Sequence, residues 1–354
     1  MNRKFWKDKK VFITGHTGFK GSWLSFWLNE CGSKLKGYSL EPSTNPNLYD
    51  VLDLNSIMDS NFGDIRHLDL LEKSISEFKP EIVIHMAAQP LVRFSYIDPI
   101  ETYSTNVMGT VNLLEACRKI ESIKAVINVT TDKCYKNKEW FWGYREHEEM
   151  GGHDPYSNSK GCSELVTSAY RDSFFGDNHN ISLASARAGN VIGGGDWAED
   201  RLIPDIFKSI INKEKLVIRN PRATRPWQHV LEPLSGYLKL AECLYLKGED
   251  FAQGWNFGPN DDDCRSVEEV ISYLVPKLNE KLSYLLDDGS SSNEPHEAQL
   301  LKLDISKAKN YLHWHPRWNI ECALDKVIEW HNGWSNNENI QELTLRQIEE
   351  YEKS

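Results

Sequence analysis

The chain has 354 residues, 40% of them apolar and 26% charged, which predicts a globular protein with a large core. The net charge of −11 argues against a general nucleic-acid binder, and the absence of any run of about 18 apolar residues predicts no membrane span. The seven cysteines are scattered without a CxxC or Cys/His cluster, so we expect reduced thiols, no metal site and a cytoplasmic protein.

The first predicted elements are a short apolar strand at 10–14, a glycine-rich turn at 15–21 and a helix at 22–31. This order indicates the start of a dinucleotide-binding βαβ unit, although the glycine spacing is GxxGxxG rather than GxGxxG. Gly15 allows the tight turn, Gly18 lets backbone amides approach a pyrophosphate, and Gly21 allows close packing of helix and strand. The predicted cofactor loop consists of Gly15, His16, Thr17, Gly18, Phe19 and Lys20.

The second predicted strand, at 33–40, ends beside Ser39 and Glu41. An acid at this position commonly holds the ribose 2′-hydroxyl of NAD, but the pattern here leaves NAD and NADP both open. After a polar loop, Asp64 is either an acceptor for the adenine amino group or a turn residue. A helix is predicted near 70–78.

A buried strand at 81–85 leads into the small residues around Ala87, Ala88 and Gln89, which leave room for a flat ring or a ribose. A long helix is predicted from about 99 to 119. It carries Asn106, for which a solvated, a structural and a cofactor-binding role are all open.

The next predicted strand, at 123–129, is followed by Thr130, Thr131, Asp132 and Lys133. Open α/β sheets bind ligands at strand carboxyl ends, so these side chains are expected to face the site. An acid beside a lysine is often a surface ion pair, but this position favours acid–base chemistry. The aromatic loop at 140–144 is either a lid or a dimer contact.

Tyr156 and Lys160 lie four residues apart at the start of a predicted helix that runs to about residue 175. This spacing places both side chains on one helical face. A lysine ammonium near the phenol would lower its pKa, so the pair is a candidate proton acceptor for a substrate hydroxyl. The alternative is a surface pair without chemistry.

A strand at 181–186 is followed by a glycine-rich segment that contains Asn190. Arg201, Arg219, Arg222 and Arg225 then accumulate, with His229 close behind. Arginines clustered in an acidic protein suggest a phosphate site, the alternative being ordinary surface residues. Further along, helices are expected at 267–275, from 306–309 onward and at about 344–350, and a polar loop at 287–297.

These motifs together resemble the extended short-chain dehydrogenases/reductases, through 14–21, Asn106, and Tyr156 with Lys160. Thr131-Asp132 is similar to the Thr-Asp-Glu motif of the nucleotide-sugar 4,6-dehydratases within that superfamily, with Lys133 in place of Glu. The blocks at 132–135, 142–146, 151–157 and 224–230 resemble the CDP-glucose branch of these dehydratases, in which the lysine is typical.

The resemblance implies an α/β fold with a Rossmann-type doubly wound parallel sheet at 1–185, to which segments at about 225–255 return. A smaller, interleaved α/β domain at 186–354 would bind the sugar nucleotide. It also implies NAD kept through the cycle, and a homodimer joined by a four-helix bundle from 99–119 and 154–175 of each chain. The cofactor residues would be the 15–20 loop with Asp64, Ile65, Ala87, Ala88, Gln89, Asn106, Thr130, Tyr156 and Lys160. The candidate substrate residues are Gln89, Arg93, Asn190, Arg201, Arg219, Arg225 and His229.

The implied activity is a 4,6-dehydration of CDP-glucose in deoxysugar (O-antigen lipopolysaccharide) biosynthesis. Tyr156 would take the proton of the 4-hydroxyl, Thr131 would hold that hydroxyl, and Asp132 would protonate the departing 6-hydroxyl. Lys133 would be the C5 base, act through water, or orient Asp132. The alternatives are another dehydratase or a 4-epimerase of the superfamily, and an NAD-sensing regulator without catalysis. The preference for CDP rests on the resemblance alone.

Overall fold

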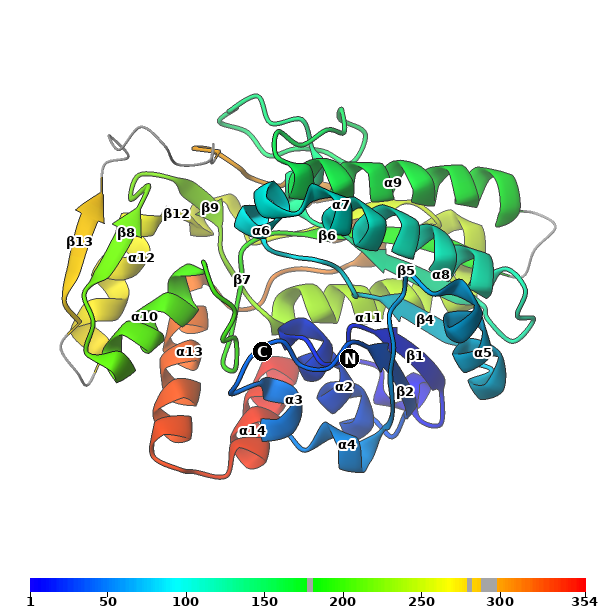
Figure 1. Cartoon of the computed structure of the whole chain (residues 1–354), viewed down its shortest axis with the longest axis horizontal. Helices are drawn as coiled ribbons and strands as arrows, with labels where there is room; N and C mark the ends of the chain where they lie inside the picture. The colour runs from blue at the N-terminus through cyan, green and yellow to red at the C-terminus, as the bar shows by residue number, and fades with distance from the viewer. Residues whose placement is uncertain (177–180, 279–281, 288–297) are drawn as a thin grey trace.

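A computed structural model of the chain describes residues 1–176, 181–278, 282–287 and 298–354 (Figure 1). At its centre, seven of the described strands form a parallel sheet in the order β11-β6-β5-β4-β1-β2-β3. These strands are β1 (Lys10–Thr14), β2 (Lys34–Ser39), β3 (Asp59–Phe62), β4 (Ile82–His85), β5 (Ala125–Val129), β6 (Ser182–Ala188) and β11 (Gly254–Phe257). The order reverses between β1 and β4, where doubly wound sheets bind ligands. The predicted Rossmann-type fold is confirmed.

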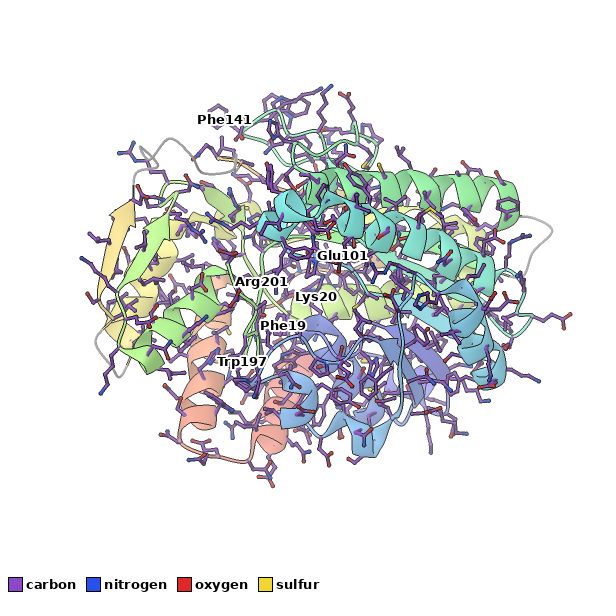
Figure 2. The ribbon with its side chains drawn as sticks, in the orientation of Figure 1. Phe19, Lys20, Glu101, Phe141, Trp197 and Arg201 are labelled. Atoms are coloured by element: carbon purple, nitrogen blue, oxygen red, sulfur yellow. The ribbon has the colours of Figure 1, made fainter. Side chains whose placement is uncertain are left out.

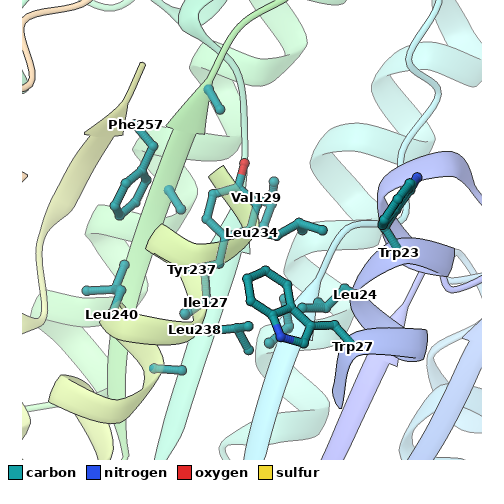
Figure 3. Packing of buried hydrophobic residues seen from close by; sticks show 14 of the residues in the cluster. Trp23, Leu24, Trp27, Ile127, Val129, Leu234, Tyr237, Leu238, Leu240 and Phe257 are labelled. Carbon is teal, nitrogen blue, oxygen red and sulfur yellow. The ribbon is translucent and has the colours of Figure 1, made fainter. Parts of the chain in front are cut away.

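Alternating strand residues pack against helices on opposite faces of the sheet. Val11 and Ile13 belong to a core shared with α2 (Phe19–Glu30) and α11 (Leu231–Lys247). Phe12 belongs to the opposite core. Figure 3 shows Trp23 and Trp27 of α2 facing the strands and α11. The second core is covered by α5 (Leu68–Phe78), α8 (Gly109–Cys117) and α9 (Pro155–Phe174). Each large apolar side chain buried this way stabilises the fold by roughly 1.5–3 kcal/mol.

The helix predicted at 99–119 is not uniform. It consists of α7 (Pro99–Tyr103), a π-helical turn at Ser104–Met108, and α8, and it is preceded by α6 (Val92–Ile97). The π turn lies where Asn106 reaches across to the chain after β4, since its Nδ2 donates to the Gln89 carbonyl at 3.0 Å. A π turn interrupts the regular hydrogen bonding of an α-helix, and such turns are frequent at functional sites.

The segment after β6 builds a smaller unit with its own apolar core. Its strands pair as β8 (Leu216–Arg219) with β13 (Tyr284–Asp287), β9 (Thr224–Pro226) with β12 (Cys264–Ser266), and β7 (Val191–Ile192) with β10 (Gln228–His229). Its helices are α10 (Leu202–Asn212), α12 (Val267–Leu274) and α13 (Ile320–Ser335). In Figure 1 this unit lies beside the central sheet. The division of the chain at residue 185 stays a prediction, but α11 and β11 do return to the central sheet.

The last helix, α14 (Ile340–Lys353), is longer than the predicted 344–350 and packs back against α2. Trp27 Nε1 donates to Glu352 at 2.8 Å, and the Trp27 and Tyr351 rings meet edge to face. The helix predicted from 306–309 contains a π turn at Ala308–Leu312. The loop predicted at 287–297 lies outside the described residues except for Asp287, which ends β13. The other described helices and turns are α1 (Arg3–Trp6), α3 (Leu48–Val51), α4 (Leu54–Ile57), and 3₁₀ turns at Asp132–Cys134, Gly248–Phe251, Asp261–Asp263 and Val275–Lys277.

Among the described residues, none of the helices combines the length and the apolar character that a membrane crossing requires.

Candidate active site

The glycine-rich turn between β1 and α2 forms a cradle that side chains would fill. Gly15 has a φ of +76°, and a Cβ there would lie 2.6 Å from the Ala87 nitrogen. A Cβ on Gly21 would lie 2.8 Å from the Gly15 carbonyl carbon. Gly18 caps α2 without a side-chain hydrogen bond, so the first amides of the helix stay available to an anion. The cradle therefore fits the pyrophosphate of a dinucleotide.

Other predicted cofactor residues carry structural contacts. The His16 ring is fully buried against Tyr49, so only its backbone can reach a ligand in the cradle, and burial lowers its pKa to about 4. Thr17 Oγ1 is hydrogen-bonded to Ser39 Oγ at 2.9 Å, which ties the loop to the end of β2. Asp64 pairs with Arg66, with 2.8 Å between Oδ2 and Nε, as expected of a turn residue.

Asn106 and Gln89 bind each other instead of presenting their amides to the site. Asn106 Oδ1 accepts from the Gln89 amide at 2.8 Å, and its Nδ2 also donates to Ser159 Oγ at 2.9 Å. The Gln89 side chain donates to Thr102 Oγ1 at 2.9 Å. Asn106 is thus not a solvated residue. Its amide links the end of β4 to α9, which carries the Tyr/Lys pair. The remaining small residues Ala87 and Ala88 follow β4, while Ile65 is buried beside Gly109.

The predicted reaction residues do come together at the carboxyl end of β5. Thr131 Oγ1 donates to Asp132 Oδ1 at 2.9 Å, and Asp132 is fully buried. Tyr156 lies in the first turn of α9, which Asp154 caps by accepting from the Ser157 amide at 2.9 Å. Lys160, one turn later, directs its ammonium toward the Val129 carbonyl at 3.4 Å. Two elements on either side of one strand end therefore supply a phenol, an ammonium, a hydroxyl and a carboxylate.

Burial dominates the electrostatics of the Tyr/Lys pair. It raises the pKa of Tyr156 to about 12, opposed by the hydrogen bond with Thr131 and the charge of Arg201. It lowers the pKa of Lys160 to about 8. The expected lowering of the Tyr156 pKa is therefore not achieved by the groups of the protein, because desolvation of the phenolate outweighs the nearby charges.

Lys20 and Arg201 add two basic side chains to the same site, and Figure 2 shows both between α2 and the smaller unit. Burial, followed by the charges of Lys160 and Arg201, lowers the pKa of Lys20 to about 7. Arg201 donates to Asp196 at 2.8 Å. Lys20 thus contributes a side chain to the reaction centre as well as a backbone amide to the cradle.

Lys133, in the 3₁₀ turn after β5, is half-buried. Its ammonium has no ion pair or hydrogen bond with any residue that the structure describes. This leaves the ammonium available for chemistry, and its role stays a prediction.

The other predicted substrate residues separate into distinct places. Arg93 and Arg219 both approach Asp200, at 3.5 and 3.2 Å. Arg225 is buried, and among its partners are the carbonyls of Thr224 at 3.0 Å and Gln299 at 3.4 Å. Asn190 has a φ of +41° and a buried Oδ1 without a partner in the described chain.

The structure does not place His229 with these residues, contrary to the sequence-based prediction. Its ring lies in the core 4.9 Å from the Trp318 ring and 5.9 Å from the Trp23 ring. Burial lowers its pKa to about 3, so the imidazole is neutral. A neutral ring enclosed by tryptophans packs the core instead of binding a diphosphate.

A family model described as GDP-mannose 4,6 dehydratase matches residues 12–327. The chain belongs to this family. Among relatives, CDP-glucose 4,6-dehydratase of Salmonella typhimurium is 57% identical over 355 residues, which cover 99% of the chain and 98% of that protein. CDP-paratose 2-epimerase of Salmonella typhi is 25% identical over 91% of the chain and 98% of its own length.

Solved structures of other nucleotide-sugar enzymes share the fold. UDP-glucose 4-epimerase of Thermotoga maritima, solved with UDP-glucose, has a TM-score of 0.78 and 21% identity, covering 92% of this chain and 99% of that one. dTDP-glucose 4,6-dehydratase of Bacillus anthracis, solved with NAD, has a TM-score of 0.74 and 22% identity, covering 94% and 99%. A parallel sheet flanked by helices is thus the common architecture of these proteins and of this member of the family.

Three residues near the site were not anticipated. Glu164, one turn after Lys160, accepts from Arg187 at 2.7 Å and from Thr130 in a fully buried network. Asp196 orients Arg201. Tyr237 enters from α11. The i+4 spacing of Lys160 and Glu164 was a signal in the sequence that could have placed Glu164 near the site. Arg187 and Tyr237 come from distant segments, and no sequence pattern connects them to the site.

Proposed function

We propose that this protein is a CDP-glucose 4,6-dehydratase, which converts CDP-D-glucose to CDP-4-dehydro-6-deoxy-D-glucose and water. The observation that carries the proposal is the 57% identity to a dehydratase of that name over nearly the whole of both chains. The gathering of Thr131, Asp132, Tyr156 and Lys160 at one strand end supports it. A 4-epimerase would not require a fully buried acid beside the Tyr/Lys pair.

NAD is the cofactor, and the cradle at 15–21 would hold its pyrophosphate. It would supply a hydride acceptor for C4 of the sugar and a hydride donor for C6, so that none is consumed. Gly15 and Gly21 allow the close approach of the pyrophosphate, and the free amides of α2 stabilise its charge. Lys160 directs its ammonium between α9 and the end of β5 and would bind the nicotinamide ribose.

The first step is oxidation at C4, for which Tyr156 accepts the proton of the 4-hydroxyl. Its buried phenol holds a high pKa on its own, so the step needs cations around the site. Arg201 lowers the pKa of Tyr156, and the ammonium of Lys160 lies one turn away on the same helix. Thr131 is hydrogen-bonded to both the phenol and Asp132, which places the 4-hydroxyl beside them.

The second step removes water across C5 and C6. The 4-ketone acidifies the C5 proton, Lys133 takes that proton, the C6–O bond breaks, and Asp132 gives its proton to the departing oxygen. Lys133 and Asp132 both belong to the 3₁₀ turn that follows β5 at this edge of the sheet. The unpaired ammonium of Lys133 must lose a proton before it can act as the base.

The diphosphate of the substrate would be bound by arginines of the smaller unit. Arg225 is buried at the junction of β9 and β12, and Arg219 and Arg93 approach each other across Asp200. Arginine is suited to this role because its guanidinium binds phosphate oxygens in pairs.

The protein forms a homodimer in the cytoplasm and acts in deoxysugar synthesis for O-antigen lipopolysaccharide. The dimer is proposed on the apolar face of α7 and α9, where Ile100 is 81% exposed and Leu165 60% exposed. A shallow groove on this face is lined by apolar residues that include Val107 and Met108. Pairing two such faces would bury the surface in a four-helix bundle. Sedimentation at several concentrations tests this, and a monomer at micromolar protein would contradict it.

The function is tested by incubating the purified protein with CDP-glucose or dTDP-glucose, with and without added NAD. Product is followed by the absorbance of the 4-keto sugar in alkali and by the mass change for lost water. We expect product from CDP-glucose only. Epimerised sugar without loss of water would replace the proposal with a 4-epimerase, and no reaction by a protein that binds NAD would support a regulator.

A further inference from the structure

Two buried polar atoms near the reaction centre lack hydrogen-bond partners among the residues that the structure describes. They are Oδ2 of Asp132 and the hydroxyl oxygen of Tyr237. Both side chains are fully buried. A buried hydroxyl without a partner destabilises a fold, and a phenylalanine would fill the same space without that cost. The hydroxyl of Tyr237 therefore needs an explanation beyond packing.

Tyr237 reaches the site from the face opposite to Tyr156. It belongs to α11, which covers the side of the sheet shared with α2, whereas Tyr156 belongs to α9 on the other side. Figure 3 shows the hydroxyl of Tyr237 directed along β5 toward Val129, at the strand end that leads to Asp132. Its ring packs edge to face on Phe257 with 5.6 Å between centroids, and the Lys20 ammonium lies 6.0 Å from its centroid. The charge of Asp132 acts on both Tyr156 and Tyr237, which come from opposite faces of the sheet.

The electrostatics agree with this placement. Burial, followed by the charges of Asp132 and Tyr156, raises the pKa of Tyr237 far above its usual value. The side chain is therefore a neutral phenol throughout the working range, and its proton is available for a hydrogen bond. In the Asp132 carboxyl group, one oxygen accepts from Thr131, and the other has no donor among the described residues.

We propose that Tyr237 is a positioning residue for the acid Asp132, donating a hydrogen bond to a water molecule that in turn donates to Oδ2. This rests on the proposed dehydration. When the C6–O bond breaks, the oxygen leaves with the proton of Asp132, and negative charge appears on its carboxylate. A donor at Oδ2 is worth more to the carboxylate than to the neutral acid, so Tyr237 makes Asp132 a stronger acid at the moment of proton transfer. The phenol keeps its own proton.

The contact is tested without substrate by a double-mutant cycle of thermal unfolding on Asp132→Ala and Tyr237→Phe. We expect the shift in Tm of the double variant to differ from the sum of the single shifts by about 2 °C. Tyr170→Phe is the matched control, because its hydroxyl donates to Glu115 at 2.8 Å, and it should be additive with Asp132→Ala. Additive shifts for Tyr237→Phe would overturn the proposal.

The role is tested with CDP-glucose by rapid mixing, comparing oxidation at C4 with water loss. In Tyr237→Phe we expect oxidation within about twofold of wild type and water loss slowed about 10-fold, the effect of one hydrogen bond to a charged group. The alkaline limb of the water-loss pH profile should move to higher pH, because Asp132 becomes a weaker acid. Equal slowing of both steps would show a merely structural tyrosine and overturn the proposal. If the cycle is non-additive but the wild-type protein does not dehydrate CDP-glucose, the contact would be supported and the proposed function refuted.

Discussion

Gly189 offers a direct test of where the acid must lie. It follows β6 and faces Asp132, and a Cβ built on it would lie 2.6 Å from Oδ1 of Asp132 and closer still to Oδ2 and Cγ. Its φ is not in the left-handed region, so alanine is compatible with the backbone. In Gly189→Ala, the new methyl group would therefore push on the Asp132 side chain and displace its carboxylate.

The size of the displacement follows from the contact distance. Ordinary van der Waals contact for a Cβ begins at 3.4 Å, so the carboxylate must move by well over 1 Å and lose its hydrogen bond with Thr131. A misplacement of about 1 Å costs roughly 10²-fold in rate for the step concerned. Overpacking should also lower the free energy of unfolding by about 1–3 kcal/mol. Oxidation at C4 depends on Tyr156 and should stay within a few-fold of wild type.

The assay follows single turnovers of CDP-glucose, recording C4 oxidation by absorbance of the reduced cofactor and water loss by quenched-flow mass analysis. Gly258→Ala is the matched control, since a Cβ there would lie at 3.4 Å or more from Leu303 and Ile305, in ordinary contact. Water loss at the wild-type rate in a folded Gly189→Ala protein would refute the assignment of Asp132 as the acid. Equal loss of both steps would show that the substitution disturbs the whole site.

Other substitutions test the remaining roles. Tyr156→Phe should slow oxidation at C4 by about 10²–10⁴-fold, the contribution of a general base, and an unchanged first step in rapid mixing would remove Tyr156 from the mechanism. Lys133→Ala should still bind NAD, as measured by calorimetry, but its elimination of water should slow by a similar factor. Full turnover would rule out a central role for Lys133. Burial raises the pKa of Glu232 to about 7 from its usual 4.5, so the folded state retains a proton that the unfolded chain has released above pH 4.5. The free energy of unfolding should therefore fall by roughly 3 kcal/mol as pH rises from about 4.5 to about 7, as measured by urea unfolding. Glu232→Gln should flatten this dependence, and an unchanged slope would contradict the raised pKa.

The sequence anticipated the elements whose signals are local. The strand at 10–14, the glycine turn and the helix after it follow from the spacing of apolar residues and from the glycines. Gly15 and Gly21 leave no room for a side chain. The strands ending at His85 and Val129 were equally readable, because central parallel strands are continuous apolar runs. The helices α10, α11 and α13 were not predicted, although α10 carries a readable apolar stripe: Ile203, Ile206 and Ile210 recur at helical spacing and pack into the core of the smaller unit.

The structure brings some of the predicted site residues together and separates others. Tyr156, Lys160, Thr131 and Asp132 meet because their elements end at the same edge of the sheet, which motif reasoning anticipates. His229 and the ring of His16 turn into the core, because adjacent residues of a strand or tight turn point to opposite sides. A sequence pattern names the residue but not the side that it faces.

What the sequence by itself determined is the chemistry available: a glycine cradle, a Tyr/Lys pair at helical spacing and an acid at a strand end. Within each motif the residues lie a few positions apart, and short-range backbone geometry places them relative to one another. Only the tertiary structure decided that Lys20, Arg201 and Tyr237, from three separate elements, surround the same carboxylate and phenol. It also decided their protonation, because the pKa of a buried group depends on how completely the fold excludes water and on which charges it brings near.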